Sequence, residues 1–458
     1  MLLSTMRAYV IVDLGFGDSG KGLLTDFLVR TQNAGVVVRY NGGAQAGHNV
    51  VDLNGRHHTF AQFGSGTFVP GVRTFLSRHV VVHPGALLVE GDILENLGLP
   101  DVFSRLKISE QALIITPFHQ AANHIRELVR GDNRHGSCGV GVGEAYEDSI
   151  NSPNDCVRAG DLSDLPGLKR KLESIRERKR SELPLSGCHN INEATLKREW
   201  EILENHGVID RWIDSISRIT RLDMVKPDGL LQNWLSRSET VVFEGAQGVL
   251  LDAVAGFHPH TTWSDCTGRN ALDIIQTMAP DSTIVQLGVL RSHAVRHGNG
   301  PLPTETNDPT GIIREHNQLN EWQGPVRYGW FDAVMARYAL RVAGQMDGLA
   351  VTHMDTLTRL NEWKYCDAYI GGPQMDTATG LIAPSEQKLK HFHSPENLSL
   401  VEREKHTQVL SNARPVLSTC VANENRVIDQ IASLLGQPVN LVSRGQTASD
   451  VQILRPLA

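Results

Sequence analysis

The sequence predicts an α/β fold: a mostly parallel central sheet with a phosphate-binding loop and a helical insertion. Short runs of β-branched residues alternate with helical stretches along the chain. Several of these runs are apolar on both faces, which is typical of parallel strands that helices cover from both sides. The first run leads directly into a glycine-rich turn and a helix. The predicted strands span residues 8–14, 35–39, 240–243, 282–290 and 348–352.

The length of the chain bounds its domain organisation. It has 458 residues, and single cores stop growing well below that size. One large domain with insertions, or two or three smaller domains, would fit this length. The sequence shows no internal repeat and no low-complexity linker, so we take residues 1–458 as one large domain with soft internal boundaries.

Composition excludes several classes of protein. The net charge of −7 predicts no general attraction to nucleic acid or to an anionic membrane surface. The 6 cysteines are scattered and form no CxxC pair, so we expect neither a disulfide framework nor a zinc site. No apolar run is long enough to span a bilayer, and the N-terminus lacks a secretory cleavage pattern. We therefore expect a cytoplasmic protein with no nucleic-acid or membrane partner.

The turn after the first predicted strand has the composition of a phosphate loop. Residues 15–22 read Gly-Phe-Gly-Asp-Ser-Gly-Lys-Gly, and a predicted helix follows over 23–30. Backbone N–H groups at such a helix N-terminus bind phosphate, and Lys21 adds a positive charge. The last position is Gly22 instead of the Ser or Thr whose hydroxyl usually holds Mg²⁺, and Asp18 is the nearest replacement. The loop residues that we expect to contact the nucleotide also include Gly17, Ser19 and Gly20.

The segment 165–237 differs from the rest of the chain. It is rich in Lys, Arg, Glu and Leu at helical spacing, as in 168–180 and 193–218. We interpret it as a helical insertion on the sheet. Its run of charged residues is typical of a solvated helix face.

Four further blocks, together with the loop, resemble the adenylosuccinate synthetase family. They read RYNGGAQAGH (39–48), VFEGAQGVLLD (242–252), RHGNGPLPTE (296–305) and GWFD (329–332). They occur in the family's order, and the resemblance extends from residue 8 to about residue 454. It implies a homodimeric carbon–nitrogen ligase of purine biosynthesis that depends on GTP and Mg²⁺. Such an enzyme phosphorylates the 6-oxygen of IMP and then displaces the phosphate with the amine of aspartate.

The resemblance also implies roles for individual residues. Asp18 matches the base and a metal ligand, His48 matches the acid, and the Gly47 carbonyl matches the backbone metal ligand. Lys21 and the loop amides would neutralise the transferring phosphoryl group, which is most of what catalysis of this step requires.

Further matched positions imply two sets of binding residues, one for the guanine base of GTP and one for the substrate. Asp355 matches the carboxylate that reads the guanine of GTP, and the region of about 348–458 would form a C-terminal base-binding subregion. His353, Ser443 and Gly445 belong to the same pocket. The residues that the resemblance assigns to substrate binding are Gln45, Ser137, Gln247, Thr262 and Arg327.

Several of these residues have plainer alternatives. His48 fits an ordinary satisfied polar residue, and Gln247 fits a side chain that bonds a turn. Asp355 fits a cap at a strand end. Thr262 fits an N-cap for a helix near 270–277.

The sequence departs from the family pattern where substrates bind. The family arginine that reaches the IMP 5′-phosphate across the dimer interface is Val140 here. Of the arginine-rich run that clamps aspartate, only Arg327 remains, because two arginines are replaced by Gly324 and Val326. Loss of one Arg–carboxylate contact costs on the order of 1.5–3 kcal/mol. The other departures are Ser19 for Glu, Gln45 for Asn and His353 for Lys.

Three hypotheses follow. The first is a ligase of this type that activates a purine-like carbonyl with GTP and adds an amine, with the acceptor or the amine changed from IMP and aspartate. The second is an authentic adenylosuccinate synthetase whose lost arginines are replaced by Arg327, Arg296 or Arg269. The third is a nucleotide-binding regulatory module without turnover, although a pure binder needs neither Asp18 nor His48. Phage-type relatives that aminate a 2-amino purine carry Ser at the position of Asp18, so the sequence disfavours that variant.

Overall fold

The computed structural model describes residues 5–131, 134–183, 193–308, 322–370, 388–392 and 398–457. Its centre is a ten-stranded sheet. Every neighbouring pair in it is parallel except β19 with β20, which lies at one edge and is antiparallel. In spatial order the strands are β20 (Val451–Ile453), β19 (Val439–Ser443), β15 (Gly348–Thr352), β11 (Thr283–Arg291), β1 (Arg7–Asp13), β10 (Thr240–Glu244), β2 (Val36–Arg39), β5 (Arg73–Leu76), β7 (Leu106–Ser109) and β9 (Val225–Lys226).

The predicted α/β class is confirmed, and all five predicted strands belong to this sheet. Most of their residues are apolar because both faces of the sheet are covered. From Ala8 onward β1 is fully buried, and the five residues of β15 are buried as well. The predicted first helix forms α1 (Lys21–Thr31), which begins two residues earlier than expected because Gly20 adopts a φ of 89° and caps it.

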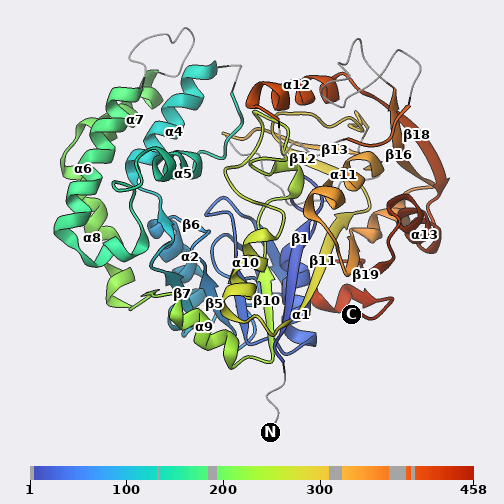
Figure 1. The fold of residues 1–458 in the computed structure, drawn as a ribbon, viewed down its shortest axis with the longest axis horizontal. Coiled ribbons are helices and arrows are strands. Elements are labelled where there is room, and N and C mark those ends of the chain that lie inside the picture. The colour runs from blue at the N-terminus through green and yellow to red at the C-terminus, as the bar shows by residue number, and fades with distance from the viewer. Residues whose placement is uncertain are drawn as a thin grey trace.

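The other helices flank the sheet at both ends. Figure 1 shows α4 to α8 gathered on one side of the molecule, and α11 to α13 with the strands β16 and β18 on the other. Their bounds are α2 (Pro84–Asn96), α3 (Val102–Arg105), α4 (Pro117–Arg130), α5 (Val142–Asn151), α6 (Leu165–Glu182), α7 (Glu193–Glu204), α8 (Gly207–Arg221), α9 (Gly229–Ser236), α10 (Arg269–Met278), α11 (Ala333–Ala343), α12 (Leu400–Ser411) and α13 (Glu424–Leu435).

Smaller sheets complete the fold. The strand β16 (Glu362–Ile370) pairs with β14 (Phe331–Asp332), β17 (Lys388–Leu389) and β18 (Arg414–Val421). The antiparallel pairs β3 (His48–Val51) with β4 (His57–Phe60), and β12 (Ala294–His297) with β13 (Val326–Gly329), stand apart from the central sheet, as does the parallel pair β6 (Val81–Val82) with β8 (Leu113–Ile114).

The segment 165–237 is mainly helical, with two differences from the prediction. It contributes β9, which pairs with β7 and forms one edge of the central sheet. The stretch 193–218 is two helices, because Asn205 and Gly207 interrupt it; the Asn205 side chain accepts a hydrogen bond from the Gly207 backbone. Residues 184–192 lie outside the described part of the chain. The division into a domain and an insertion stays a prediction.

The prediction that the charged run of this segment faces solvent is wrong for two residues of α6. Arg176 and Lys179 are buried. The Lys179 ammonium lies 2.9 Å from a Glu144 carboxylate oxygen and 2.8 Å from one of Asp148. These ion pairs tie α6 to α5, since a buried cation requires such partners. Among the described helices, none is long and apolar enough to cross a membrane.

Candidate nucleotide and purine site

The phosphate loop connects β1 to α1 at the carboxyl edge of the parallel sheet, where ligands bind in folds of this kind. Gly17, Asp18 and Gly20 all have positive φ (92°, 57° and 89°), which folds the loop back over the start of α1. Gly248 also presses on the loop, because a Cβ there would lie 2.2 Å from the Gly15 carbonyl oxygen. The predicted loop is therefore present with the backbone curvature that phosphate binding needs.

A buried carboxylate that the sequence analysis missed forms the floor of the loop. Asp13, the last residue of β1, accepts hydrogen bonds from the backbone N–H groups of Gly15 and Ser19 and from the Ser19 hydroxyl. Its Oδ2 also lies 2.7 Å from the Lys21 ammonium, and both side chains are buried. Asp13 thus holds Lys21 and the loop backbone in one network.

The absent loop hydroxyl has a steric explanation. A Cβ added at Gly22 would lie 2.9 Å from the Cβ of His48 and 3.1 Å from the Asn49 carbonyl oxygen. Glycine therefore allows β3 to approach α1 closely enough to place His48 beside the loop.

His48 is paired with a buried glutamate. Its Nδ1 lies 2.6 Å from Glu244 Oε1, at the carboxyl end of β10. Ser65 donates to Glu244 through both its backbone N–H and its hydroxyl. Burial and the nearby Arg39 lower the pKa of His48 to about 4, although Glu244 opposes that shift. Burial alone raises the pKa of Glu244, but Arg39, His48 and Ser65 outweigh it and hold that pKa below its ordinary value.

The resulting pair is a neutral imidazole beside an ionised carboxylate. Since a carboxylate only accepts, His48 Nδ1 carries the proton and Nε2 is the unprotonated nitrogen. The alternative in which His48 is an ordinary hydrogen-bonded polar residue therefore describes Nδ1, which Glu244 engages.

Asp18 faces two cationic or polar side chains from the other strands. Its Oδ2 lies 2.5 Å from His297 Nε2, and its backbone carbonyl accepts from Arg291 Nε. Burial raises the pKa of Asp18, but the hydrogen bond and charge of His297 and the charges of Arg291 and Lys21 lower it further, and the net shift is downward. Asp18 is therefore an ionised carboxylate at neutral pH.

Among the described residues, Gln45 and Gln247 have buried amide oxygens without a hydrogen-bond partner. Both lie beside the glycine pair that follows β2: an added Cβ on Gly42 would be 2.9 Å from Gln247 Oε1, and one on Gly43 would be 2.9 Å from Gln45 Oε1. A buried unpaired acceptor costs about 1–3 kcal/mol unless a ligand supplies a donor. In the described part of the chain the Gln247 amide oxygen bonds no turn.

The expected guanine-binding residues follow the adjacent strands β15 and β19, and the end of β15 contacts the phosphate loop. β15 ends at Thr352, whose hydroxyl donates to the Ser19 carbonyl over 2.9 Å. His353 follows with a φ of 57°, and Asp355 is half-exposed in the short 3₁₀ helix Met354–Arg359. Ser443 ends the neighbouring strand β19 and donates to the Gly445 carbonyl over 2.9 Å.

Ser137 and Thr262 have separate surroundings. The Ser137 hydroxyl lies 3.0 Å from the Asn123 side-chain nitrogen. The backbone N–H of Thr262 donates to the Leu251 carbonyl over 2.8 Å. The alternative in which Thr262 caps a helix is wrong, because α10 begins at Arg269 with Gly268 as its N-cap. Val140, where the family carries arginine, packs against the apolar cluster that includes Val81 and Ile115.

The three arginines named as replacements for the lost ones are engaged by protein atoms. Arg327 donates to the carbonyls of Gly298 and Gly300 and to the Glu305 carboxylate, over 2.9, 2.6 and 2.7 Å. Arg296 is buried and donates to three carbonyls, those of Asn299, Pro301 and His260. Burial, with the charge of Arg327, lowers the pKa of Arg296 to about 9. Arg269 is half-exposed and pairs with Asp265 over 3.1 Å.

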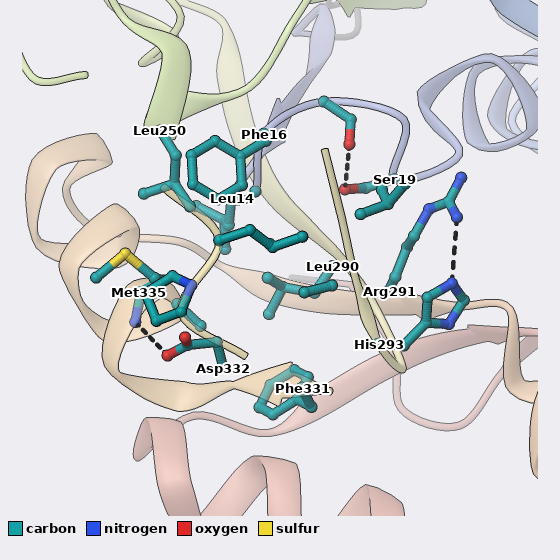
Figure 2. A pocket seen from close by; sticks show the side chains of 17 residues that line it. Leu14, Phe16, Ser19, Leu250, Leu290, Arg291, His293, Phe331, Asp332 and Met335 are labelled. Carbon is teal, nitrogen blue, oxygen red and sulfur yellow. Dashed lines mark hydrogen bonds between the residues drawn. The ribbon is translucent and has the colours of Figure 1, made fainter. Parts of the chain in front are cut away.

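An apolar pocket adjoins the phosphate loop. Figure 2 shows Phe16, Leu14 and Leu250 on one side of it and Arg291 with His293 on the other. The cavity volume is about 50 Å³. Asp332 reaches it but is held by protein, since its carboxylate accepts from Tyr369 and from the backbone of α11.

The described residues contain no cluster of three or more His, Cys, Asp or Glu side chains arranged to hold a metal ion. Asp18 and the exposed Gly47 offer one carboxylate and one carbonyl oxygen. This all-oxygen donor set fits Mg²⁺, which keeps several waters and takes its remaining ligands from nucleotide phosphates.

Comparisons with known proteins identify sequences similar to this chain. Residues 10–452 match the family model described as "Adenylosuccinate synthetase". An adenylosuccinate synthetase from Nitrosomonas eutropha is 34% identical over 369 residues, 80% of each chain. One from Brevibacillus brevis is 31% identical over 461 residues, covering 98% of this chain and 99% of the relative.

Solved structures extend the comparison of folds. The fully ligated adenylosuccinate synthetase of Plasmodium falciparum superposes with a TM-score of 0.75 at 18% identity, covering 98% of this chain and 99% of that one. The succinoaminodeoxyadenylate synthetase of cyanophage S-2L, bound to dGMP and to dATP as an energy donor, gives 0.59 at 17% identity and covers 99% and 96%. At these identities the likeness concerns the fold alone.

Proposed function

Because the chain belongs to the adenylosuccinate synthetase family, we propose that it uses GTP and Mg²⁺ to phosphorylate the carbonyl oxygen of a purine-like nucleotide, which an amine then attacks. The convergence of Asp18, Lys21 and the His48–Glu244 pair on one loop is the observation that carries this proposal. The altered residues are those that bind the acceptor phosphate and the amine donor, so we propose that the acceptor or the amine differs from IMP and aspartate.

In the first step, ionised Asp18 takes the N1 proton of the purine lactam, and the carbonyl oxygen attacks the γ-phosphorus of GTP as GDP leaves. Lys21 and the loop N–H groups bind the phosphates. Bound Mg²⁺, held by Asp18, the Gly47 carbonyl and the phosphates, would neutralise charge there. In the second step the amine nitrogen attacks C6 and inorganic phosphate leaves, with the amine proton passing to solvent.

The protonation of His48 adds a requirement to this scheme. His48 is neutral and its Nε2 lacks a proton, so it can donate to a phosphoryl oxygen only after it gains one. The negative charge of an incoming phosphate favours that protonation. The role of acid therefore belongs to the liganded enzyme.

Selection of GTP is assigned to Asp355, with His353, Ser443 and Gly445 around the base. A carboxylate accepts from both the N1–H and the 2-amino group of guanine, while adenine presents an acceptor at N1. The support is positional: β15 and β19 are adjacent parallel strands, and Thr352 joins the end of β15 to the phosphate loop.

Gln45 and Gln247 support a purine acceptor. Their two unpaired amide oxygens lie beside the Gly42–Gly43 pair and would accept from ligand N–H groups. We assign Ser137 and Thr262 to the same acceptor. Three residues support an altered substrate. Val140 packs into an apolar cluster and Val326 lies in β13, where the family carries arginines. Arg327 is held by protein oxygens.

The second candidate is an authentic adenylosuccinate synthetase that uses IMP and aspartate. The relatives from N. eutropha and B. brevis, which bear that name, favour it. On the same basis we propose a homodimer, and its mass in solution, measured by light scattering, tests this point.

A substrate panel tests both candidates. Purified enzyme is given GTP or ATP with Mg²⁺, one of several purine nucleotides including IMP and dGMP, and one of several amines including aspartate, and products are identified by mass. Formation of an aminated product from a partner other than the IMP–aspartate pair supports the first candidate. Efficient saturation with IMP and aspartate together supports the second. Nucleotide binding without any phosphate release across the panel would leave a regulatory binding protein.

A further inference from the structure

We propose that His297 is a positioning residue that holds the Asp18 carboxylate in its reactive orientation. This inference deepens the proposed function and rests on it for the role of Asp18. His297 ends β12, and its Nε2 lies 2.5 Å from Asp18 Oδ2. The two residues are 279 positions apart in the sequence, and His297 lies in the block 296–305, where the sequence analysis assigned it no role.

Within the described ranges, Asp18 makes only one hydrogen bond through its carboxylate, the contact with His297. Its backbone has a φ of 57°, and its carbonyl is held by Arg291. The carboxylate itself belongs to a side chain that is 31% exposed, so packing alone does not select its orientation. His297 Nε2 donates to Oδ2, because an ionised carboxylate only accepts. Oδ1 is then the oxygen directed by this contact toward substrate or metal.

His297 also connects Asp18 to the segment in which the sequence departs from its family. β12 and β13 are antiparallel, and His297 lies opposite Val326 in their register. The next residues extend the connection: Gly298 N–H donates to the Pro325 carbonyl, and Arg327 donates to the Gly298 carbonyl, each over 2.9 Å. A displacement of the segment 324–327 is therefore passed to His297 and to the proposed base.

The test compares two amides at residue 297. The Gln side-chain nitrogen falls close to the position of His Nε2, whereas that of Asn falls close to Nδ1, which does not reach Asp18. His297→Asn is expected to lower kcat by about 10- to 100-fold, since a 1 Å displacement of a reacting group costs about that much. The KM for GTP should change by less than about threefold, because phosphate binding belongs to Lys21 and the loop amides. His297→Gln should retain kcat within about threefold of the unmodified enzyme.

Crystal structures of the two variants supply a readout that does not depend on turnover. The Asp18 carboxylate is expected to stay in place in His297→Gln and to rotate away in His297→Asn. His206→Ala serves as the matched control, because His206 is the N-cap residue of α8 and its side chain is 73% exposed, and the change should leave kcat and the Asp18 geometry unchanged.

Equal loss of kcat in the Gln and Asn variants, or an unmoved Asp18 carboxylate in His297→Asn, overturns the inference. If the unmodified enzyme turns over none of the nucleotides in the panel, the proposed function fails, and the two crystal structures still decide whether His297 positions Asp18.

Discussion

His48 Nδ1 and Glu244 Oε1 lie 2.6 Å apart in a pocket that buries both side chains. The pair fixes the imidazole ring so that Nε2 is the nitrogen left for a ligand. Glu244→Gln should lower kcat by about 10- to 100-fold, because partners of this kind orient the ring and set its tautomer. It should also reduce stability, since buried Arg39 loses its counter-charge. Steady-state kinetics and thermal melting measure the two effects. Ser65→Ala is the control: it removes one hydrogen bond to Glu244 but keeps the carboxylate, so its loss in kcat should be clearly smaller.

Asp18→Ala should abolish turnover while the fold survives, because it removes the proposed base and a metal ligand together. General base catalysis raises the reaction rate by about 10²- to 10⁴-fold, and the metal ion raises it further. Asp18→Asn retains the shape but has no basic carboxylate, so it should be equally inactive. Nucleotide-dependent phosphate release and circular dichroism check both variants. Near-normal phosphate release from Asp18→Ala would falsify the assignment of the base.

Asp355→Ala should weaken the preference for GTP over ATP. Adenine leaves the N1 acceptor opposite a carboxylate, and such a mismatch costs roughly 1–3 kcal/mol, or about 5- to 150-fold in kcat/KM. The ratio of kcat/KM for GTP and ATP, measured for both proteins, is the relevant quantity. Equal efficiency with the two nucleotides in the unmodified protein contradicts this assignment.

Restoring the family arginines should improve the use of aspartate. Unmodified enzyme is expected to saturate with aspartate only at high concentration. Val326→Arg should lower the KM for aspartate by about tenfold or more, as one charge-assisted Arg–carboxylate contact allows. Gly324→Arg with Val326→Arg completes the family pattern, but Gly324 has a φ of 90°, so a side chain there is strained. Val326→Gln, polar but uncharged, is the control. Tight saturation of the unmodified enzyme with aspartate in the presence of IMP would show that other residues already supply the clamp.

Asp332 should make the stability of the protein depend on pH. Burial raises its pKa to about 6, although Tyr369 and the α11 backbone oppose that shift. A carboxyl whose folded-state pKa is raised binds more protons when folded, so its contribution to the free energy of unfolding falls as pH rises from about 4 to about 6. The loss amounts to roughly 3 kcal/mol above pH 6. Asp332→Asn keeps an N-cap side chain and should remove this dependence. Urea unfolding at pH 4 and pH 7 measures it, and identical pH profiles for the two proteins would contradict the raised pKa.

The strands and the phosphate loop were predictable because they are local patterns: apolar runs that need cover on both faces, followed by glycines that permit positive φ. The side chains that contact the site residues were not predictable from the sequence. In the sequence, Asp13 is only part of a predicted strand, and Glu244 lies inside a matched block in which it was assigned no role. Arg291 ends β11, which pairs with β1, and His297 ends the separate strand β12 that follows β11 in the chain; the sequence order does not reveal that both side chains reach Asp18. Lys179 is buried because α5 packs against α6, and the helical spacing of charges in the sequence does not reveal that contact.

Gly22 and His48 form a coupled pair of positions. Ser at residue 22 would provide the hydroxyl of an ordinary phosphate loop, yet its Cβ would lie 2.9 Å from the His48 Cβ and 3.1 Å from the Asn49 carbonyl oxygen. This backbone therefore accommodates either a side chain at residue 22 or the close approach of β3 to α1. Replacing His48 by another residue with a Cβ would keep the contact, so a change to an ordinary phosphate loop requires β3 to move away from α1, and with it the position of the histidine.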